Sequence, residues 1–180
     1  SAGIGDWSLM STGCWNGVLG DTPAHPDPWS KSVVGWVNPK KVGGALIAEP
    51  IEEAATSPDV YQLLDGSPGS RSGEYFLVEN RRREGFDAGL PASGLLIWHV
   101  DDGIKDNGNQ WYPGCANCVG HYRVTLIQAD RRWDLEKNAN RGDSGDPFSE
   151  SDLETLLYRG GPGGVSVTAI SAPGHTMTAT

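Results

Sequence analysis

The chain has 180 residues, enough for one domain with a sizeable core, and hydrophobic residues make up 37% of it. Its formal net charge of −9 and pI near 4.8 argue against binding to nucleic acid or anionic membranes, and no apolar run approaches the roughly 18 residues of a membrane span. The 25 glycines and 12 prolines favour many short strands joined by turns. We therefore expect an α+β fold that is predominantly β, with few short helices.

Strands are predicted where apolar residues alternate or run together between turn signals. Tyr75–Val78 and Leu95–Trp98 are apolar throughout, which is typical of strands covered on both faces. Glu79 continues the first of them, and a buried carboxylate there needs a partner such as Arg81 or a backbone amide. The predicted strands are Val33–Val37, Ala45–Ala48, Val60–Leu64, Tyr75–Glu79, Leu95–Val100, Tyr122–Gln128, Val165–Ile170 and Thr176–Ala179.

Two short helices are predicted from their first residues. Asp27 followed by Pro28 is typical of an N-cap and a proline at the first helical position, which predicts a helix through about Val33. The sequence from Ser151 to Glu154 fits a capping box and predicts a second helix through Leu156 and Tyr158, ending before Gly160.

The segment Gly5-Asp6-Trp7-Ser8-Leu9-Met10-Ser11 resembles the methionine-containing turn that lies beneath the zinc in secreted zinc proteases, in particular in the immune-inhibitor-A-like (M6) metallopeptidase family. Further blocks resemble that family in the same order along the chain: Pro23–Lys31, Gly73–Arg81, Gly94–Asp101 and Asn140–Phe148. In the family a His-Glu-x-x-His helix ends just upstream of the turn. No such motif occurs in these 180 residues.

The resemblance implies the C-terminal part of a metzincin-like catalytic domain in a secreted zinc metalloendopeptidase that acts on peptides or proteins. Residues 1–180 would form one domain or subdomain, with the methionine turn and cleft floor in 1–37 and a β-rich, calcium-binding part in 45–180. Met10 would be the apolar floor beneath the metal, while the zinc ligands and the catalytic glutamate would lie on an upstream segment. This chain alone is then expected to be inactive.

The expected partner is the N-terminal part of the same protease domain, or further copies of this chain, because a domain cut at this point would leave apolar side chains without cover. We expect those uncovered side chains to be Trp7, Leu9, Met10 and Trp15. A different class also remains open, in which the chain is a non-catalytic structural or self-assembling extracellular protein derived from a peptidase domain.

The four histidines allow several interpretations. His99 ends an apolar strand, and it is either a hydrogen-bond donor near the zinc or a buried histidine satisfied by a carboxylate such as Asp101. His25 precedes a predicted helix and either faces the cleft or has a capping or packing role. His121 and His175 have no partners nearby in sequence, and we assign them no role.

Oxygen-rich residues at short spacing indicate a calcium site in 130–146, since calcium takes six to eight oxygen ligands and the glycines here let the backbone fold around an ion. The frame of an EF-hand is missing. A solvated acidic turn is the alternative, but such a carboxylate cluster repels itself unless it is neutralised. The candidate ligands are Asp130, Asp134, Asn140, Asp143 and Asp146.

Cys115 and Cys118 are expected to form a small disulfide loop. A haem anchor would need histidine directly after the second cysteine, a zinc site would need two further ligands at comparable spacing, and a redox pair would need a strand–helix junction. Cys14 is expected to be buried and free, or to pair between chains.

Overall fold

The computed structural model of the chain describes residues 3–64, 73–156 and 162–180. Within these residues nine strands accompany one α-helix and three short 3-10 helices. The fold is therefore of the α+β class and predominantly β, as the composition predicts. No helix in the described part of the chain has the length and apolar character needed to cross a membrane.

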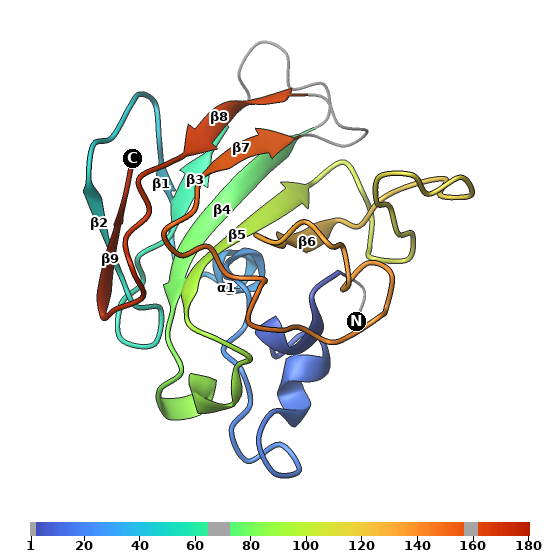
Figure 1. Cartoon of the computed structure of the whole chain (residues 1–180), viewed down its shortest axis with the longest axis horizontal. Helices are drawn as coiled ribbons and strands as arrows, with labels where there is room; N and C mark the ends of the chain where they lie inside the picture. The colour runs from blue at the N-terminus through green and yellow to red at the C-terminus, as the bar shows by residue number, and fades with distance from the viewer. Residues whose placement is uncertain (1–2, 65–72, 157–161) are drawn as a thin grey trace.

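A five-stranded sheet with the strand order β1-β3-β4-β5-β6 forms the centre of the molecule (Figure 1). Its middle strands, β4 (Glu74–Arg81) and β5 (Gly94–Asp101), pair antiparallel over their whole length. β1 pairs parallel to β3, and the other neighbours are antiparallel. The remaining strands of the sheet are β1 (Lys40–Lys41), β3 (Tyr61–Leu63) and β6 (Val124–Ile127).

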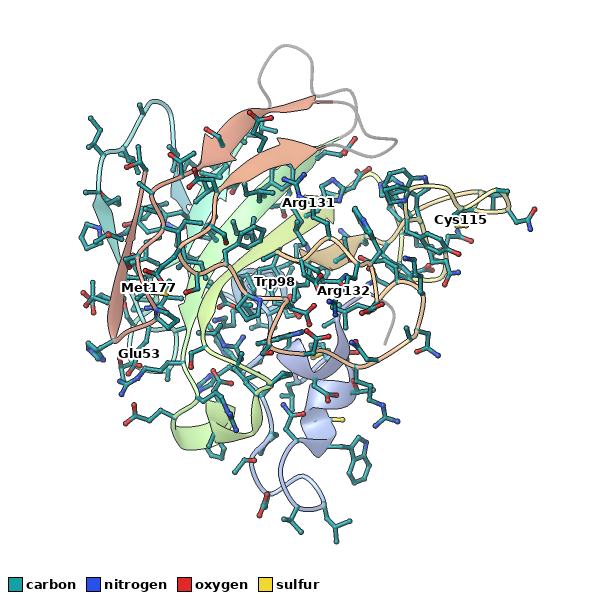
Figure 2. All side chains as sticks on the ribbon, viewed as in Figure 1. Glu53, Trp98, Cys115, Arg131, Arg132 and Met177 are labelled. Atoms are coloured by element: carbon teal, nitrogen blue, oxygen red, sulfur yellow. A yellow bond between two sulfur atoms is a disulfide. The ribbon has the colours of Figure 1, made fainter. Side chains whose placement is uncertain are left out.

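Side chains alternate between the two faces of this sheet along each strand. Both faces are buried, because a separate hydrophobic cluster covers each of them. On one face Leu77, Leu96 and Trp98 pack against the N-terminal segment, with α1 behind the sheet in Figure 1. On the other face Phe76 and Ile97 pack against two small sheets, and Figure 2 shows Met177 at the side where one of these lies. The small sheets pair β2 (Glu49–Glu52) with β9 (Thr176–Ala179), and β7 (Leu153–Leu156) with β8 (Pro162–Val167).

The only α-helix among the described residues, α1 (Pro28–Val33), begins as the sequence predicts. The Asp27 carboxylate accepts a hydrogen bond from Ser30 N at 2.8 Å, so it caps the helix, and Pro28 occupies the first turn, where a missing N–H costs nothing. The helix ends at Val33, Val34 is its C-cap, and Gly35 follows with a positive φ of 77°.

Three predicted elements differ from the structure. The segment after Ser151 forms strand β7 and no helix, because Leu153 and Glu154 pair with β8. Part of that predicted helix, residues 157–161, lies outside the described residues. Val33–Val37 is the end of α1 and a turn, and Ala45–Ala48 is a loop leading into β2.

The N-terminal segment contains two 3-10 helices, η1 (Gly5–Trp7) and η2 (Thr12–Trp15), while η3 (Gly85–Gly89) connects β4 to β5. The prediction that Trp7 lacks cover is wrong, because its side chain is fully buried in the core beneath the sheet. Leu9, Met10 and Trp15 are uncovered in this structure, with exposures of 39%, 65% and 66%.

Candidate functional site

We call the segment of residues 5–11 the methionine turn. Buried hydrogen bonds fix its backbone, while the side chains of Leu9 and Met10 are exposed. Ser8 Oγ accepts hydrogen bonds from Met10 N at 3.1 Å and from Asp27 N at 3.0 Å, and it donates to Asp27 Oδ2 at 2.8 Å. Ser8 and Asp27 are both buried, so these bonds tie the turn to the start of α1. The backbone of Met10 is therefore anchored although its side chain is exposed.

A network of buried charges lies under the methionine turn. Arg81 binds Asp87 through two nitrogens, at 2.6 and 2.7 Å, and Glu79 Oε1 at 3.0 Å, while Lys31 Nζ lies 2.7 Å from Glu79 Oε2. Arg81 Nη1 also donates to Trp7 O at 3.3 Å. Burial opposes ionisation of Glu79, but the charges of Lys31 and Arg81 outweigh it and keep the pKa of Glu79 below its ordinary value. Glu79 thus has the predicted partner, Arg81, and a second one in Lys31. The network joins the sheet to the methionine turn.

The same network fixes the backbone of His25 beside the methionine turn. His25 N donates to Asp87 Oδ1 at 2.9 Å, and His25 O accepts from Arg81 Nη2 at 3.4 Å and from Leu9 N at 3.3 Å. The His25 ring meets Phe86 edge-on, with 6.3 Å between ring centroids. Burial lowers the pKa of His25 from its ordinary value, with Asp87 opposing this effect and Arg81 adding to it. The sequence could not show this placement, because the residues that hold His25 lie 16 to 62 positions away along the chain.

His99 lies on the opposite face of the sheet from the buried Trp7 of the methionine turn. It faces the same side as Phe76, with 5.4 Å between the ring centroids. His99 Nε2 lies 2.9 Å from Glu74 Oε2, so its carboxylate partner is Glu74 and not Asp101. The structure does not bring His99 and Met10 together.

His121, which received no role from the sequence, pairs with the carboxylate that was expected for His99. Its Nε2 lies 2.9 Å from Asp101 Oδ2, and both side chains are buried. Burial lowers the pKa of His121 from its ordinary value, while the hydrogen bond with Asp101 opposes the shift. The His99 and His121 rings lie 6.0 Å apart, so two histidine–carboxylate pairs occupy this end of the sheet.

Three of the five predicted calcium ligands meet in space. Asp130, Asp134 and Asp143 form what we call the acidic cluster, in which each offers a carboxylate oxygen within 4.8 Å of the others. A Cβ atom on Gly145 would lie 2.8 Å from Asp130 Oδ2 and 3.1 Å from Asp143 Oδ1, so a larger residue there would displace these carboxylates. Asn140 Nδ2 donates to Asp143 Oδ2 at 2.8 Å, and Asn140 Oδ1 accepts from Gly142 N at 2.9 Å, so Asn140 lies beside the acidic cluster.

Asp146 is the buried neighbour of the acidic cluster. Its Oδ2 accepts from Trp7 Nε1 and from Asp143 N, both at 2.9 Å. Its Oδ1 is buried and has no hydrogen-bond partner among the described residues. Burial, together with the charges of Asp143 and Asp130, raises the pKa of Asp146 to about 6. Arg132 forms an ion pair with Asp130 at 3.4 Å, but its side chain is largely exposed, and a pair of that kind neutralises little charge. The arrangement suits a hard cation with oxygen ligands.

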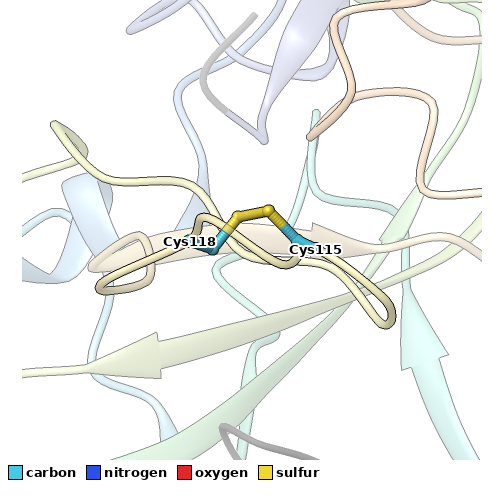
Figure 3. Close-up of a disulfide and its surroundings, with 2 residues drawn as sticks. All are labelled: Cys115 and Cys118. Carbon is cyan, nitrogen blue, oxygen red and sulfur yellow. A yellow bond between two sulfur atoms is a disulfide. The ribbon is translucent and has the colours of Figure 1, made fainter.

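Cys115 and Cys118 form the predicted disulfide, with a Cα–Cα distance of 5.6 Å, at the tip of a long loop (Figure 3). Cys14 is a free thiol, but its side chain is only partly buried, which differs from the expected full burial. The disulfide stands apart from the methionine turn, on the far side of β6 (Figures 1 and 2).

The residues that the structure describes do not bring together a ligand set that fits a catalytic zinc. Such sites use three histidine, cysteine or carboxylate ligands with an open position, usually including imidazole. Among the described residues, the group of potential ligands that comes within coordinating distance is the acidic cluster, which contains carboxylates alone. Comparison of the chain with protein-family models, with curated proteins and with solved structures finds no match.

Proposed function

We propose that this chain forms the methionine-turn and scaffold portion of a secreted, M6-like zinc metalloendopeptidase that hydrolyses peptides or proteins. The zinc ligands and the catalytic glutamate would lie on a segment outside these 180 residues. The proposal rests on the sequence blocks that resemble that family and on one structural observation.

That observation is the contrast between the anchored backbone and the open side chains of the methionine turn. Met10 N is bound by buried Ser8, and the turn sits on the buried Arg81 network. Leu9, Met10 and Trp15 nevertheless expose much of their apolar surface. An ordered apolar patch without cover normally marks a surface that another segment or molecule occupies. A floor beneath a metal-binding helix has these properties.

The contribution of this chain is then positional. Met10 offers a soft, apolar side chain suited to packing beneath another element, and the sheet with its buried charges holds it in place. Since the described residues do not fit the zinc, we assign no chemical step to the metal within them.

A charge placed at Met10 tests the proposal. The protein is expressed with the coding sequence upstream of Ser1, and hydrolysis of a quenched fluorescent peptide library is measured with zinc, after chelation, and after zinc is restored. In Met10→Asp, a carboxylate must be buried against the covering segment, so zinc-dependent hydrolysis should fall about tenfold or more. The matched control is Ile47→Asp, since Ile47 is also an exposed apolar residue but lies in the loop before β2.

Zinc-dependent hydrolysis that is lost in Met10→Asp and retained in Ile47→Asp would support the proposal. An unchanged rate in Met10→Asp, or hydrolysis that does not depend on zinc, would contradict it.

We also propose that calcium binds at the acidic cluster and stabilises the scaffold. Three carboxylates converge there with little compensating charge, and the buried Oδ1 of Asp146 lacks a hydrogen-bond partner among the described residues. Gly145 leaves the space between the carboxylates open. These features suit an oxygen-ligated ion and are costly for a protein without one.

Calcium should raise the unfolding temperature, because a ligand that binds only the folded state stabilises it by mass action. At a free concentration 100 times the dissociation constant, the rise for a domain of this size is roughly 5–10 °C. Asp143→Ala should abolish most of that rise. Asp21→Ala is the matched control, since Asp21 is an exposed aspartate that accepts a hydrogen bond from Val18 N far from the cluster.

Differential scanning calorimetry with calcium and with EGTA measures both variants. A calcium response in Asp143→Ala that equals the response of the unchanged protein would rule out this site.

A further inference from the structure

A cavity of about 460 Å³ lies within the long loop between β5 and β6. Its walls come from residues between Gly108 and Tyr122, and the loop stands at the edge of the molecule beyond β6 (Figure 1). Both cysteines of the disulfide line it. The described residues of the methionine turn and of the acidic cluster do not. The volume falls within the range of roughly 300–1,000 Å³ that small-molecule sites occupy.

The described residues that line this cavity are polar but uncharged. Their polar side chains are amides and phenols, namely those of Asn109, Gln110, Tyr112, Asn117 and Tyr122. Residues 107–122 contain no Asp, Glu, Lys or Arg, although these types make up 21% of the chain. An ionised ligand in a concave site needs a compensating charge close by. The walls therefore favour a ligand without charge.

The groups in the walls also indicate which uncharged ligand would fit. A hydroxyl group both donates and accepts a hydrogen bond, and a side-chain amide offers the matching acceptor and donor. Aromatic rings provide an apolar surface for C–H groups, and a phenol adds a hydroxyl at its end. A compound with many hydroxyls, apolar C–H faces and no charge is a neutral sugar.

We propose that this cavity binds a neutral mono- or disaccharide. The amides of Asn109, Gln110 and Asn117 exchange hydrogen bonds with the sugar hydroxyls, and a tyrosine ring of the wall covers an apolar face of the sugar. This site lies outside the proposed peptidase machinery and does not depend on it.

Contacts at both ends of the loop hold the cavity in shape. At the start, Asn107 Nδ2 donates to Val124 O at 2.6 Å, and Asn107 Oδ1 accepts from Val124 N at 3.0 Å, so this side chain pairs with β6 as a strand would. At the end, the buried His121 pairs with Asp101 of β5. The disulfide closes the turn between these ends. A site that is shaped before binding loses less conformational entropy when its ligand arrives.

Amide NMR spectra of the isotope-labelled protein test the proposal. The probes are lactose, maltose and chitobiose, the uronic-acid counterparts of these disaccharides, and an uncharged, end-capped peptide. We expect at least one of the neutral disaccharides to shift the amide signals of residues 108–122. Its affinity should not change with salt concentration, because no charges meet in the complex. The acidic counterpart should bind more weakly, because the walls offer its carboxylate no cation.

A substitution in the wall tests the role of the cavity. Asn117→Ala removes one lining amide and should weaken binding of the disaccharide about three- to tenfold, which corresponds to the loss of one hydrogen bond. Asn117 is exposed, so the folded structure should tolerate the change. Asn38→Ala is the matched control and should leave the affinity unchanged, since Asn38 is also an exposed asparagine but lies between α1 and β1.

Three results would overturn the inference: no shift in residues 108–122 with any neutral disaccharide, shifts with the peptide alone, or an acidic counterpart that binds as tightly as the neutral sugar. Equal affinities in Asn117→Ala and Asn38→Ala would overturn the role of the cavity walls. A protein that binds a neutral disaccharide here but shows no zinc-dependent hydrolysis would keep this site and lose the proposed function.

Discussion

Arg81 connects more of this molecule than any other side chain in the site. Its guanidinium binds two carboxylates, Glu79 and Asp87, and the carbonyl oxygens of Trp7 and His25. All three charged side chains are almost completely buried. The planar guanidinium presents five donors in a fixed geometry, so lysine could not make these contacts together. Arg81 therefore sets the position of the methionine turn relative to the sheet.

Replacing Arg81 should be among the most damaging substitutions in the chain. Arg81→Met retains much of the side-chain volume but leaves two buried carboxylates without their shared cation, so the free energy of unfolding should fall by about 3–5 kcal/mol. Arg82→Met is the control, since Arg82 directly follows the last residue of β4 and makes partly exposed ion pairs, and it should cost at most about 1 kcal/mol. Urea unfolding followed by tryptophan fluorescence measures both. Equal losses in the two variants would show that the network carries no special weight.

His121 gives the molecule a stability that depends on pH. Its pKa is lowered by folding, so the folded state favours the neutral ring. Such a group contributes stability above the unfolded pKa of about 6.5 and loses it as the pH falls through the lower, folded value. In His121→Gln, the decline in unfolding free energy from pH 7 to pH 5 should therefore be shallower than in the unchanged protein.

Urea titrations at several pH values give this slope, and His175→Gln is the control, because its ring is mostly exposed. A slope in His121→Gln as steep as that of the unchanged protein would show that other groups carry the pH dependence.

At the scale of elements, the sequence predicts a helix or strand correctly where residues within the element itself determine its conformation. β4 and β5 could be predicted because their apolar runs need cover on both faces, and the two hydrophobic clusters provide it. α1 could be predicted because Asp27 and Pro28 define its first turn without help from distant residues.

Other elements could not be predicted because their state depends on a distant partner. Residues 151–154 carry a helix-start pattern, yet pairing with β8 makes the segment from Leu153 a strand. β1 is two lysines long and exists through its parallel pairing with β3. β2 begins at Glu49 and pairs with β9, about 130 positions further along the chain.

The candidate site shows the same division. The acidic cluster could be predicted, since its members lie within 14 positions of one another in one loop. The contacts of His25 with Arg81 and Asp87, and of Lys31 with Glu79, join segments that the sequence separates by 48 to 62 positions. Residue types alone did not indicate that these segments would meet.

At the scale of the whole molecule, the sheet separates two differently built halves. The N-terminal segment and α1 cover one face, with the methionine turn and its buried charges. The strands β2, β7, β8 and β9 cover the other, and His99 belongs to that side. Substitutions that reach the proposed peptidase site should therefore come from the first face, whereas the second serves mainly to close the core.

One hydrogen bond has a consequence for how the methionine turn and the acidic cluster influence each other. Trp7 of the methionine turn donates to Asp146, whose other neighbour is Asp143 of the acidic cluster, and Asp6 N also binds Arg141 O at 2.6 Å. If a cation at the acidic cluster restricts the position of Asp146, it also restricts the position of the methionine turn, because Trp7 is hydrogen-bonded to Asp146. Suppose that the bound cation raises the affinity of the methionine turn for the segment that covers it. By thermodynamic reciprocity, binding of that segment must then raise the affinity of the acidic cluster for the cation by the same factor. The two equilibria therefore share a single coupling free energy, and either binding curve, recorded with and without the other ligand, reports it.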